Sequence, residues 1–451
     1  MTRQELNREI LRLSIPSILA NITVPVVGMV DTAVAGHLPG IAAVSIGAIS
    51  LGSMLFTLLY WLVGFLRTGT GGLTAQAFGR DDMNASAGIM IRGLGIAGIV
   101  SAVILALQVP FIHLATLFTD GTDEVEELAT RYFLIRVWAA PATISLMVFR
   151  GWFAGMQDSM SSMWTDLIVN VVNMAASIVL ALGIGGWEGL GFDGVPLGTV
   201  VAQYSGMLWC IGVVFFKYRH KVFSRFERSS LRSLFSRNSM GGFMAMNMDL
   251  FGRGIFFISI YVGFTALSTC LGDMMLACGA VLMQLLMFFS FFTDGFAYAG
   301  EALAGRFIGA RDNAMLRMST RYVFYWAMGV AVLFMGIYAI CGVPALRILT
   351  DDPAVIEACR AYLPWLMLMP PLGCAAFTWD GIYMGATASK GIFHGMVMAA
   401  IGFYAVWYIG KAALNPGPEL ALHILMAAYF MHLLMRTLWL SVRAEKEVLS
   451  R

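Results

Sequence analysis

Charged residues are scarce in this sequence. Only 12% of its 451 residues are Asp, Glu, Lys or Arg, whereas 59% are hydrophobic. A soluble protein is about 25% charged on average, so this chain has too little charge to coat a water-facing surface of its size. The composition excludes an ordinary soluble enzyme, a disordered chain and a nucleic-acid binder. The net charge of +2 by itself indicates no partner.

Signatures of metal, ATP and cofactor chemistry are also missing. The six cysteines are scattered through apolar stretches without CxxC spacing, and the six histidines show neither HxxxH nor HExxH spacing. The glycine cluster at 68–80 lacks the GxxxxGK[ST] pattern of an ATP site. We therefore predict no metal site and no cofactor. The polar N-terminus is followed by no short apolar core with a cleavage site, so no signal peptide is expected.

Long apolar runs are what the sequence does contain. We count twelve segments of the length that crosses a bilayer, which takes roughly 20 residues as a helix. None shows the ten-residue alternation of a membrane barrel. We therefore expect an all-α integral membrane protein with 12 transmembrane helices. The segments are 10–37, 42–66, 88–115, 132–154, 161–185, 193–216, 239–265, 276–305, 320–343, 361–385, 391–411 and 420–441.

The cations are distributed unevenly between the two sides of these spans. With a cytoplasmic N-terminus, 22 of the 29 Lys and Arg fall on the cytoplasmic side, five on the other side, and Arg150 and Arg253 within spans. This asymmetry predicts cytoplasmic N- and C-termini. The most basic loop predicts a linker over 217–238 between an N-lobe (1–216) and a C-lobe (239–451).

The two halves show an internal repeat at one constant offset of 230 residues. Six spans separate the copies, an even number, so both copies insert with the same orientation. Two six-helix lobes related by a pseudo-twofold axis along the membrane normal are expected. Such duplication is typical of transporters, whose substrate passes between two rocking lobes. The matched pairs are Gly79/Gly309, Asp82/Asp312, Tyr132/Tyr362, Pro141/Pro371, Gly151/Gly381, Gly155/Gly385 and Ser159/Ser389.

One carboxyl group stands out in the first span. Asp31 lies 21 residues after Ile10, about 31 Å along a helix, and therefore in the outer half of the membrane. Pro16 and Pro25 precede it, and each removes a backbone hydrogen bond and can bend the helix. Intramembrane acids are functional by default. We interpret Asp31 as a group that takes and releases a proton; the alternative is a neutral acid that serves packing.

A polar stripe follows the fifth span. Asp166, Asn170, Asn173 and Ser177 occupy positions i, i+4, i+7 and i+11 and share one helix face. Such a face must turn towards protein or water rather than lipid. Two interpretations stay open: the stripe joins helices by hydrogen bonds, or it lines the same cavity as Asp31.

The second half carries its own polar residues within spans. Asp249 and Arg253 are i, i+4, which favours a local ion pair. Asp294, Tyr298 and Glu301 share a face of the eighth span, and Asp380 lies in the tenth. Asp380 matches Arg150 at the repeat offset, so an ion pair between the lobes is one hypothesis and a static buried network is the other.

Six strings make the chain resemble the multidrug and toxic compound extrusion (MATE) transporters, with closest similarity to their DinF-like branch. They are SIPSI (14–18), VDTAVAGH (30–37), RGWFAGMQ (150–157), DGFAYAGEALAG (294–305), IGARD (308–312) and WDGIYMGA (379–386). The resemblance implies secondary active export coupled to inward flow of H+ or Na+. It also implies Asp31 as the protonation site, Pro16 as the bending point and Asn170 with Asn173 as the polar partners.

The sequence departs from the family at Ser177, where many relatives have an Asp. Asp31 then lacks an acidic neighbour, which argues against a Na+ site in the N-lobe. Coupling rests on Asp31 alone or shifts to Asp249, Asp294, Glu301 and Asp380.

We therefore expect a monomeric antiporter of the bacterial inner membrane, not an enzyme. It would export amphipathic or cationic organic compounds, with H+ favoured over Na+ as the coupling ion. The alternative within the same superfamily is a flippase of lipid-linked substrates. A more cationic cavity would be expected for a flippase, and only Arg150 and Arg253 are assigned to the membrane interior, since cations near span ends are counted with the adjoining side.

Overall fold

The computed structural model describes residues 1–38, 41–116, 122–223 and 237–450, and they are almost entirely helical. Apart from one isolated bridge between Ile184 and Trp187, these ranges contain no β-structure. Apolar spans favour helices because lipid offers no hydrogen-bond partner to the backbone. The predicted linker over 217–238 lies mostly outside the described residues.

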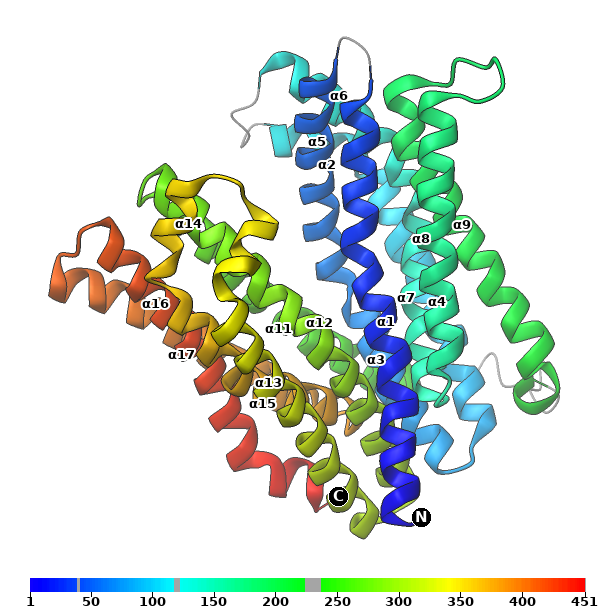
Figure 1. Cartoon of the computed structure of the whole chain (residues 1–451). Helices are drawn as coiled ribbons and strands as arrows, with labels where there is room; N and C mark the ends of the chain where they lie inside the picture. The colour runs from blue at the N-terminus through cyan, green and yellow to red at the C-terminus, as the bar shows by residue number, and fades with distance from the viewer. Residues whose placement is uncertain (39–40, 117–121, 224–236, 451) are drawn as a thin grey trace. The chain divides into compact units, whose positions relative to one another are not determined.

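By their internal contacts the helices form two compact units (Figure 1). The N-terminal unit comprises Leu19–Gly242, and the C-terminal unit comprises Met1–Ile18 together with Phe243–Arg451. The first 18 residues thus pack with the C-terminal unit, whereas the sequence-based division assigned them to the first lobe.

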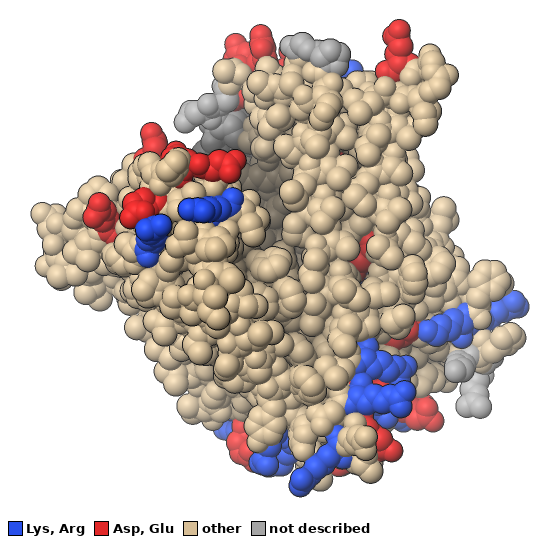
Figure 2. All heavy atoms as spheres, in the orientation of Figure 1, with Lys and Arg blue, Asp and Glu red and all other residues tan. Residues whose placement is uncertain are grey.

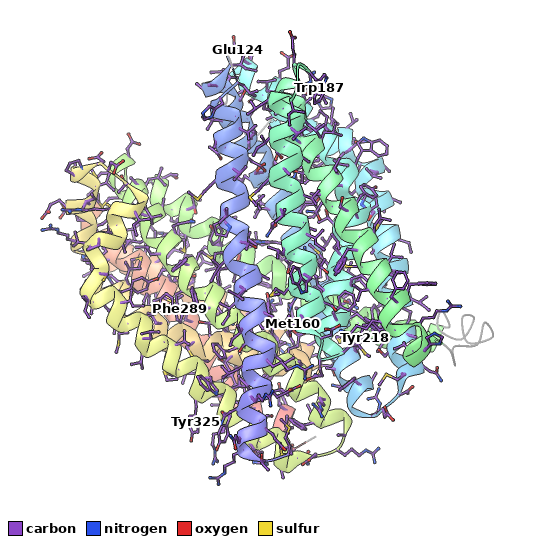
Figure 3. The ribbon with its side chains drawn as sticks, turned by 45° about the vertical axis from the view of Figure 1, so that its right-hand side comes forward. Glu124, Met160, Trp187, Tyr218, Phe289 and Tyr325 are labelled. Carbon is purple, nitrogen blue, oxygen red and sulfur yellow. The ribbon has the colours of Figure 1, made fainter. Side chains whose placement is uncertain are left out.

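The N-terminal unit contains the second half of α1 and the next eight α-helices, followed by a π-helical segment, η3. The bounds are α1 (Arg3–Gly36), α2 (Ala42–Val63), α3 (Phe65–Gly79), α4 (Met83–Ala106), α5 (Gln108–Thr116), α6 (Asp123–Arg136), α7 (Ala140–Gly155), α8 (Ser159–Leu182), α9 (Gly194–Val213) and η3 (Val214–Phe223), with short 3-10 turns η1 (Val137–Ala139) and η2 (Gly191–Asp193). Figure 3 places Glu124 and Trp187 at one end of this unit and Met160 and Tyr218 towards the other.

The C-terminal unit contains the start of α1 and seven further α-helices. Their bounds are α11 (Arg237–Thr269), α12 (Asp273–Gly309), α13 (Asn313–Leu349), α14 (Pro353–Arg360), α15 (Leu363–Gly385), α16 (Ser389–Leu414) and α17 (Pro418–Ala444), and the π-helical η4 (Glu445–Leu449) follows.

Among the described residues, eleven helices or continuous helix pairs are long and apolar enough to cross a membrane. A twelfth span results if α14 and α15, which meet at a bend of 60°, are taken together. The prediction of an all-α multi-pass membrane protein is confirmed. In Figure 2 most charged side chains of the visible face gather towards helix ends, with largely uncharged surface between them.

The 230-residue repeat is visible in the local backbone. Asp82 caps α4 by accepting from the Ala85 amide at 2.9 Å, and Asp312 caps α13 by accepting from the Met315 amide at 2.9 Å. The residue before each cap is left-handed, with φ of 57° at both Asp81 and Arg311. Both halves therefore make the same turn at matching positions.

Matching glycines also make the same helix crossings. A Cβ on Gly151 would lie 2.2 Å from the carbonyl oxygen of Arg67, and one on Gly381 would lie 2.0 Å from that of Ala297. Arg67 and Ala297 are themselves 230 positions apart. The absence of a side chain thus lets α7 touch the backbone of α3, and α15 that of α12, in the same way.

Helix α1 belongs to both units. Neither Pro16 nor Pro25 interrupts it. Ile18 packs against α12, where a Cβ on Gly295 would lie 2.3 Å from the Ile18 side chain. The change from one unit to the other falls between Ile18 and Leu19, two residues after a proline that leaves the Arg12 carbonyl without its helical donor.

Candidate functional site

Asp31 is buried on the half of α1 that belongs to the N-terminal unit, with 8% of its surface exposed. Its carboxyl group experiences the positive charge of Arg136 on α6 and the polarity of the Ser177 hydroxyl on α8. Within the described residues its Oδ1 atom has no hydrogen-bond partner. The carboxyl therefore keeps an oxygen open for a proton or another cation.

Arg136 is held in place by groups other than Asp31. Its guanidinium donates to the hydroxyls of Tyr132 at 2.6 Å and Ser53 at 3.2 Å, and lies 4.8 Å from the ring centre of Phe56. No salt bridge joins Arg136 to Asp31 in the described part of the chain. The charge of Arg136 thus acts on Asp31 without forming an ion pair with its carboxyl oxygens. Sequence reasoning missed this residue because it stands near the predicted start of a span, although Tyr132 one turn earlier was a usable signal.

The polar stripe of α8 divides among several partners. Asp166 forms a salt bridge of 2.6 Å with Arg150. The Asn170 amide donates to Thr23 of α1, and the Asn173 amide donates to Thr199 of α9 at 2.9 Å. The Ser177 hydroxyl donates to the Val195 carbonyl at 3.4 Å, and it is the member whose polarity acts on the Asp31 carboxyl. These ion-pair and hydrogen-bond partners are those of a stripe that joins helices. That the stripe also lines a cavity with Asp31 stays a prediction.

A second polar cluster lies in the C-terminal unit. Asp380 on α15, 4% exposed, accepts hydrogen bonds from Arg253 of α11 and Arg436 of α17. One of the Arg436 bonds, from Nε to Oδ1, measures 2.9 Å, and this arginine is only 2% exposed. A single buried carboxylate thus pairs with two guanidinium groups, which leaves the cluster with one excess positive charge.

One predicted pairing in this cluster is wrong. Arg253 does not pair with Asp249 one turn away but with Asp380, and Asp249 accepts a 2.7 Å bond from the Ser389 hydroxyl. Within their own units, Arg150 pairs with Asp166, and Asp380 pairs with Arg253 and Arg436, as in the static buried network. For Arg253, the reach of a side chain to a neighbouring helix outweighs spacing along one helix.

The remaining candidates lie on α12. Asp294 and Tyr298 are half-buried, and Glu301 is 2% exposed. In the described ranges no three His, Cys, Asp or Glu side chains are arranged to hold a metal ion. Arg436 was counted at the cytoplasmic end from sequence, yet it is buried. The buried or half-buried arginines of the helices therefore include Arg136 and Arg436 besides Arg150 and Arg253.

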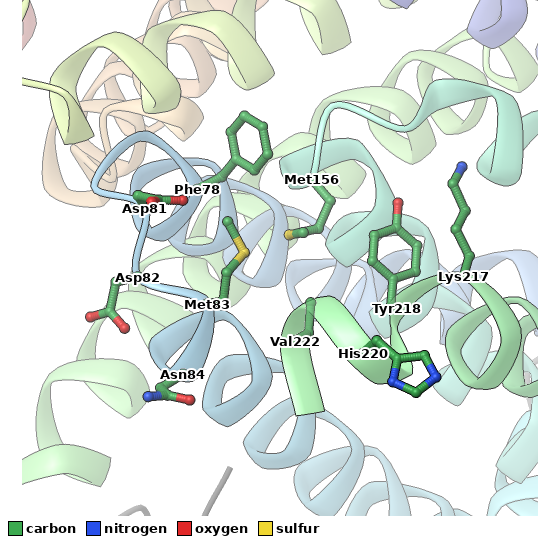
Figure 4. A pocket seen from close by; sticks show the side chains of 10 residues that line it. All are labelled: Phe78, Asp81, Asp82, Met83, Asn84, Met156, Lys217, Tyr218, His220 and Val222. Atoms are coloured by element: carbon green, nitrogen blue, oxygen red, sulfur yellow. The ribbon is translucent and has the colours of Figure 1, made fainter. Parts of the chain in front are cut away.

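An open pocket of about 650 Å³ lies at the end of the N-terminal unit marked by Tyr218 (Figure 4). Lys217 and Tyr218 stand side by side on η3, and Asp81 and Asp82 border the pocket from the turn between α3 and α4. Beside this pocket, Asp158 accepts 2.7 Å bonds from both Lys217 and Tyr218. Burial raises the pKa of Asp158, but bonds from Lys217, Ser161 and Tyr218 outweigh it and hold the pKa below its usual 3.8.

Replacing Asp158 by Asn is expected to lower the free energy of unfolding at neutral pH by about 1–2 kcal/mol, since two charge-assisted hydrogen bonds are lost. Because the folded pKa lies below the unfolded one, this contribution is complete above pH 3.8 and disappears as the pH falls through the folded value. Unfolding in detergent should therefore show wild type and D158N converging at acid pH. A difference that stays constant with pH would contradict this assignment.

Comparison with known proteins agrees with this architecture. The sequence profile of the family described as MatE matches residues 16–179 and 251–408. The chain is 33% identical over 391 residues to DNA damage-inducible protein F of Escherichia coli (strain K12), covering 87% of this chain and 83% of that protein. It is 25% identical over 373 residues to a probable multidrug resistance protein NorM of Caulobacter vibrioides, covering 79% and 76%.

The fold also matches a solved structure. A crystal structure of MATE in the bent conformation superimposes with a TM-score of 0.85 at 16% identity, and the match covers 100% of both chains. The resemblance predicted from sequence is confirmed, as is the prediction that the protein is a transporter rather than an enzyme. The chain belongs to the MatE family, the multidrug and toxic compound extrusion transporters, and is DinF-like within it.

Proposed function

We propose that the protein exports small amphipathic or cationic organic compounds in exchange for protons, with Asp31 as the protonation site. The single observation that carries the proposal is the buried Asp31 carboxyl, whose Oδ1 has no hydrogen-bond partner among the described residues. Intramembrane carboxyl groups mark ion and proton pathways. Neutralising Asp31 changes what it can offer Ser177 and Arg136, and so changes how α1 is held against α6 and α8.

A proton suits this cluster better than Na+. A proton needs one oxygen, whereas hard metal cations take a shell of several oxygen ligands. In the described surroundings, Asp31 Oδ1 and Asn173 Oδ1 are acceptors that lack a donor. No second carboxylate stands at position 177, and the nearby charge of Arg136 opposes an additional metal ion.

The C-terminal unit offers a weaker coupling site. Asp380 is occupied by two arginines, so protonating it would break both ion pairs at once. Asp249 is bonded to Ser389. Glu301 is the buried acid of this unit that remains a candidate.

Bending of α1 near Pro16 is the proposed movement. The helix changes from one unit to the other just after this proline, and proline is a common cause of helix kinks. Pro25 provides a second weak point between the unit boundary and Asp31. Protonation at Asp31 would therefore act on a helix that both units share.

The positive-inside distribution supports cytoplasmic termini in a bacterial inner membrane. We propose the monomeric two-lobe organisation predicted from the sequence, with lobes over 1–216 and 239–451, except that Met1–Ile18 of the first lobe packs with the second.

Reconstitution into liposomes with separately imposed pH and sodium gradients tests the proposal. We expect a pH gradient alone to drive uptake of a fluorescent organic cation into liposomes that hold the protein inverted, and a sodium gradient alone to drive none. Transport driven by sodium at constant pH would refute proton coupling.

The flippase alternative has gained one supporting observation. Arg136 and Arg436 add to the cations within the helices, although Arg253 and Arg436 share Asp380 and Arg150 is paired with Asp166. Transfer of a fluorescent lipid-linked saccharide between leaflets of the same liposomes, without uptake of the organic cation, would favour this alternative.

A further inference from the structure

A second, smaller cavity of about 360 Å³ lies between α4, α7 and the junction of α9 with η3. Its walls are formed by Met90 and Leu94 of α4, Phe149 of α7, and Ile211 and Phe215. Arg219 stands at its η3 side and is its one charged wall residue among the described residues. The cavity is therefore an apolar groove with a single cation at one end.

The groove belongs to helices that qualify as membrane spans. α4 and the stretch from Gly191 to His220 are both long and apolar enough to cross a bilayer. Ile211 is 47% exposed and Phe215 is 51% exposed. Exposed apolar side chains on a spanning helix face lipid chains, so a hydrocarbon chain is the occupant that the environment supplies.

Arg219 is held at the mouth of this groove. Its guanidinium lies 5.0 Å from the ring centre of Phe215, one turn before it. Lys217 and Tyr218, between them in sequence, bind Asp158 instead. The segment η3 is thus anchored through Asp158, while Phe215 and Arg219 serve the groove. Within the described residues Arg219 forms no salt bridge, so its charge is not neutralised by a carboxylate.

We propose that this groove binds an anionic phospholipid, with an acyl chain between α4 and α9 and the phosphate beside Arg219. An apolar groove in a spanning helix pair that ends in an unneutralised guanidinium is complementary to such a lipid in shape and charge. Lys217 does not compete for the phosphate, because Asp158 neutralises it. The lipid would connect α4 to η3 and stabilise the N-terminal unit. This site is separate from the Asp31 cluster and does not depend on the coupling ion.

Native mass spectrometry of the purified full chain, with phosphatidylglycerol or phosphatidylcholine added in detergent, tests the site. A basic residue near a membrane surface contributes about 1 kcal/mol to anionic lipid binding, a roughly five-fold preference. We expect wild type to prefer phosphatidylglycerol by about this factor, Arg219→Gln to lose the preference, and Arg219→Lys to keep most of it. Arg321→Gln, an exposed arginine of α13 in the other unit, is the matched control and should behave as wild type.

Two further arms separate the lipid from other occupants. Val214 also lines the groove, so Val214→Trp should fill it and abolish the preference even though Arg219 is present. Glycerol phosphate, which has no acyl chain, should not raise the unfolding temperature as phosphatidylglycerol does. Equal binding of both lipids by wild type, or an unchanged preference in Arg219→Gln, would overturn the proposal. So would displacement of the lipid by a second copy of the chain or by an organic cation. Because Arg219 is exposed, its variants are expected to fold even if Val214→Trp does not.

Discussion

Asp31→Asn is expected to reduce proton-driven transport of an organic cation to the level of protein-free liposomes. Asparagine keeps the size of the side chain but cannot exchange a proton between pH 5 and 8. The variant should still fold, because Asp31 forms no salt bridge within the described residues and Asn has nearly the same size and shape. Transport under a pH gradient, with substrate binding measured separately in detergent, checks this result.

Two companion variants make the test specific. Asp31→Glu retains a carboxyl group and should retain slow, proton-driven transport. Asp193→Asn removes a carboxylate of the same unit that pairs with exposed Arg131; such surface pairs contribute about 0–1 kcal/mol, so transport should be unaffected. Full proton-driven transport by Asp31→Asn would place the coupling group elsewhere, with Glu301 the next candidate.

The sequence was sufficient to single out two kinds of feature: residues that repeat between the two halves, and polar residues that cannot face lipid. Lipid excludes unpaired polar groups, so Asp31 was recognisable as an acid within an apolar span, and the α8 stripe from its helical periodicity. The 230-residue offset identified Gly151 and Gly381, whose lack of a side chain the helix crossings require. Features of this kind are accessible to sequence reasoning because they depend on spacing within one helix or on a comparison of the halves.

Features that depend on which helices become neighbours were not predictable in this way. Arg253 had a carboxylate one turn away, yet it pairs with Asp380, 127 positions later. Arg436 stands near the end of the last span, where basic residues are common, and nothing along its own helix indicated a partner 56 positions earlier. The 60° bend between α14 and α15 was likewise absent from the apolar pattern.

The Asp380 cluster leads to the second large expected effect, on stability. Asp380→Asn leaves the guanidinium groups of Arg253 and Arg436 without their shared carboxylate, although Arg436 is only 2% exposed. Removing one partner of a buried ion pair typically costs about 3–5 kcal/mol. We expect a sharply lower unfolding temperature in detergent and poor recovery of the folded protein.

The double variant Asp380→Asn/Arg436→Met distinguishes charge imbalance from loss of packing. Methionine fills much of the same space without a charge, so the double variant should recover part of the stability that Asp380→Asn loses.

The Asp380 variants should also leave proton coupling unchanged. The folded fraction of either variant should transport with the wild-type dependence on pH, because Asp380 is paired with two arginines and is not the group that takes up the proton. Asp31→Asn is expected to show the reverse pattern, with stability kept and coupling lost. If Asp380→Asn proved stable but its transport no longer depended on the pH gradient, the Asp380 cluster would be part of the transport cycle. The proposal that Asp31 couples transport to protons while Asp380 only stabilises the C-terminal unit would then be wrong.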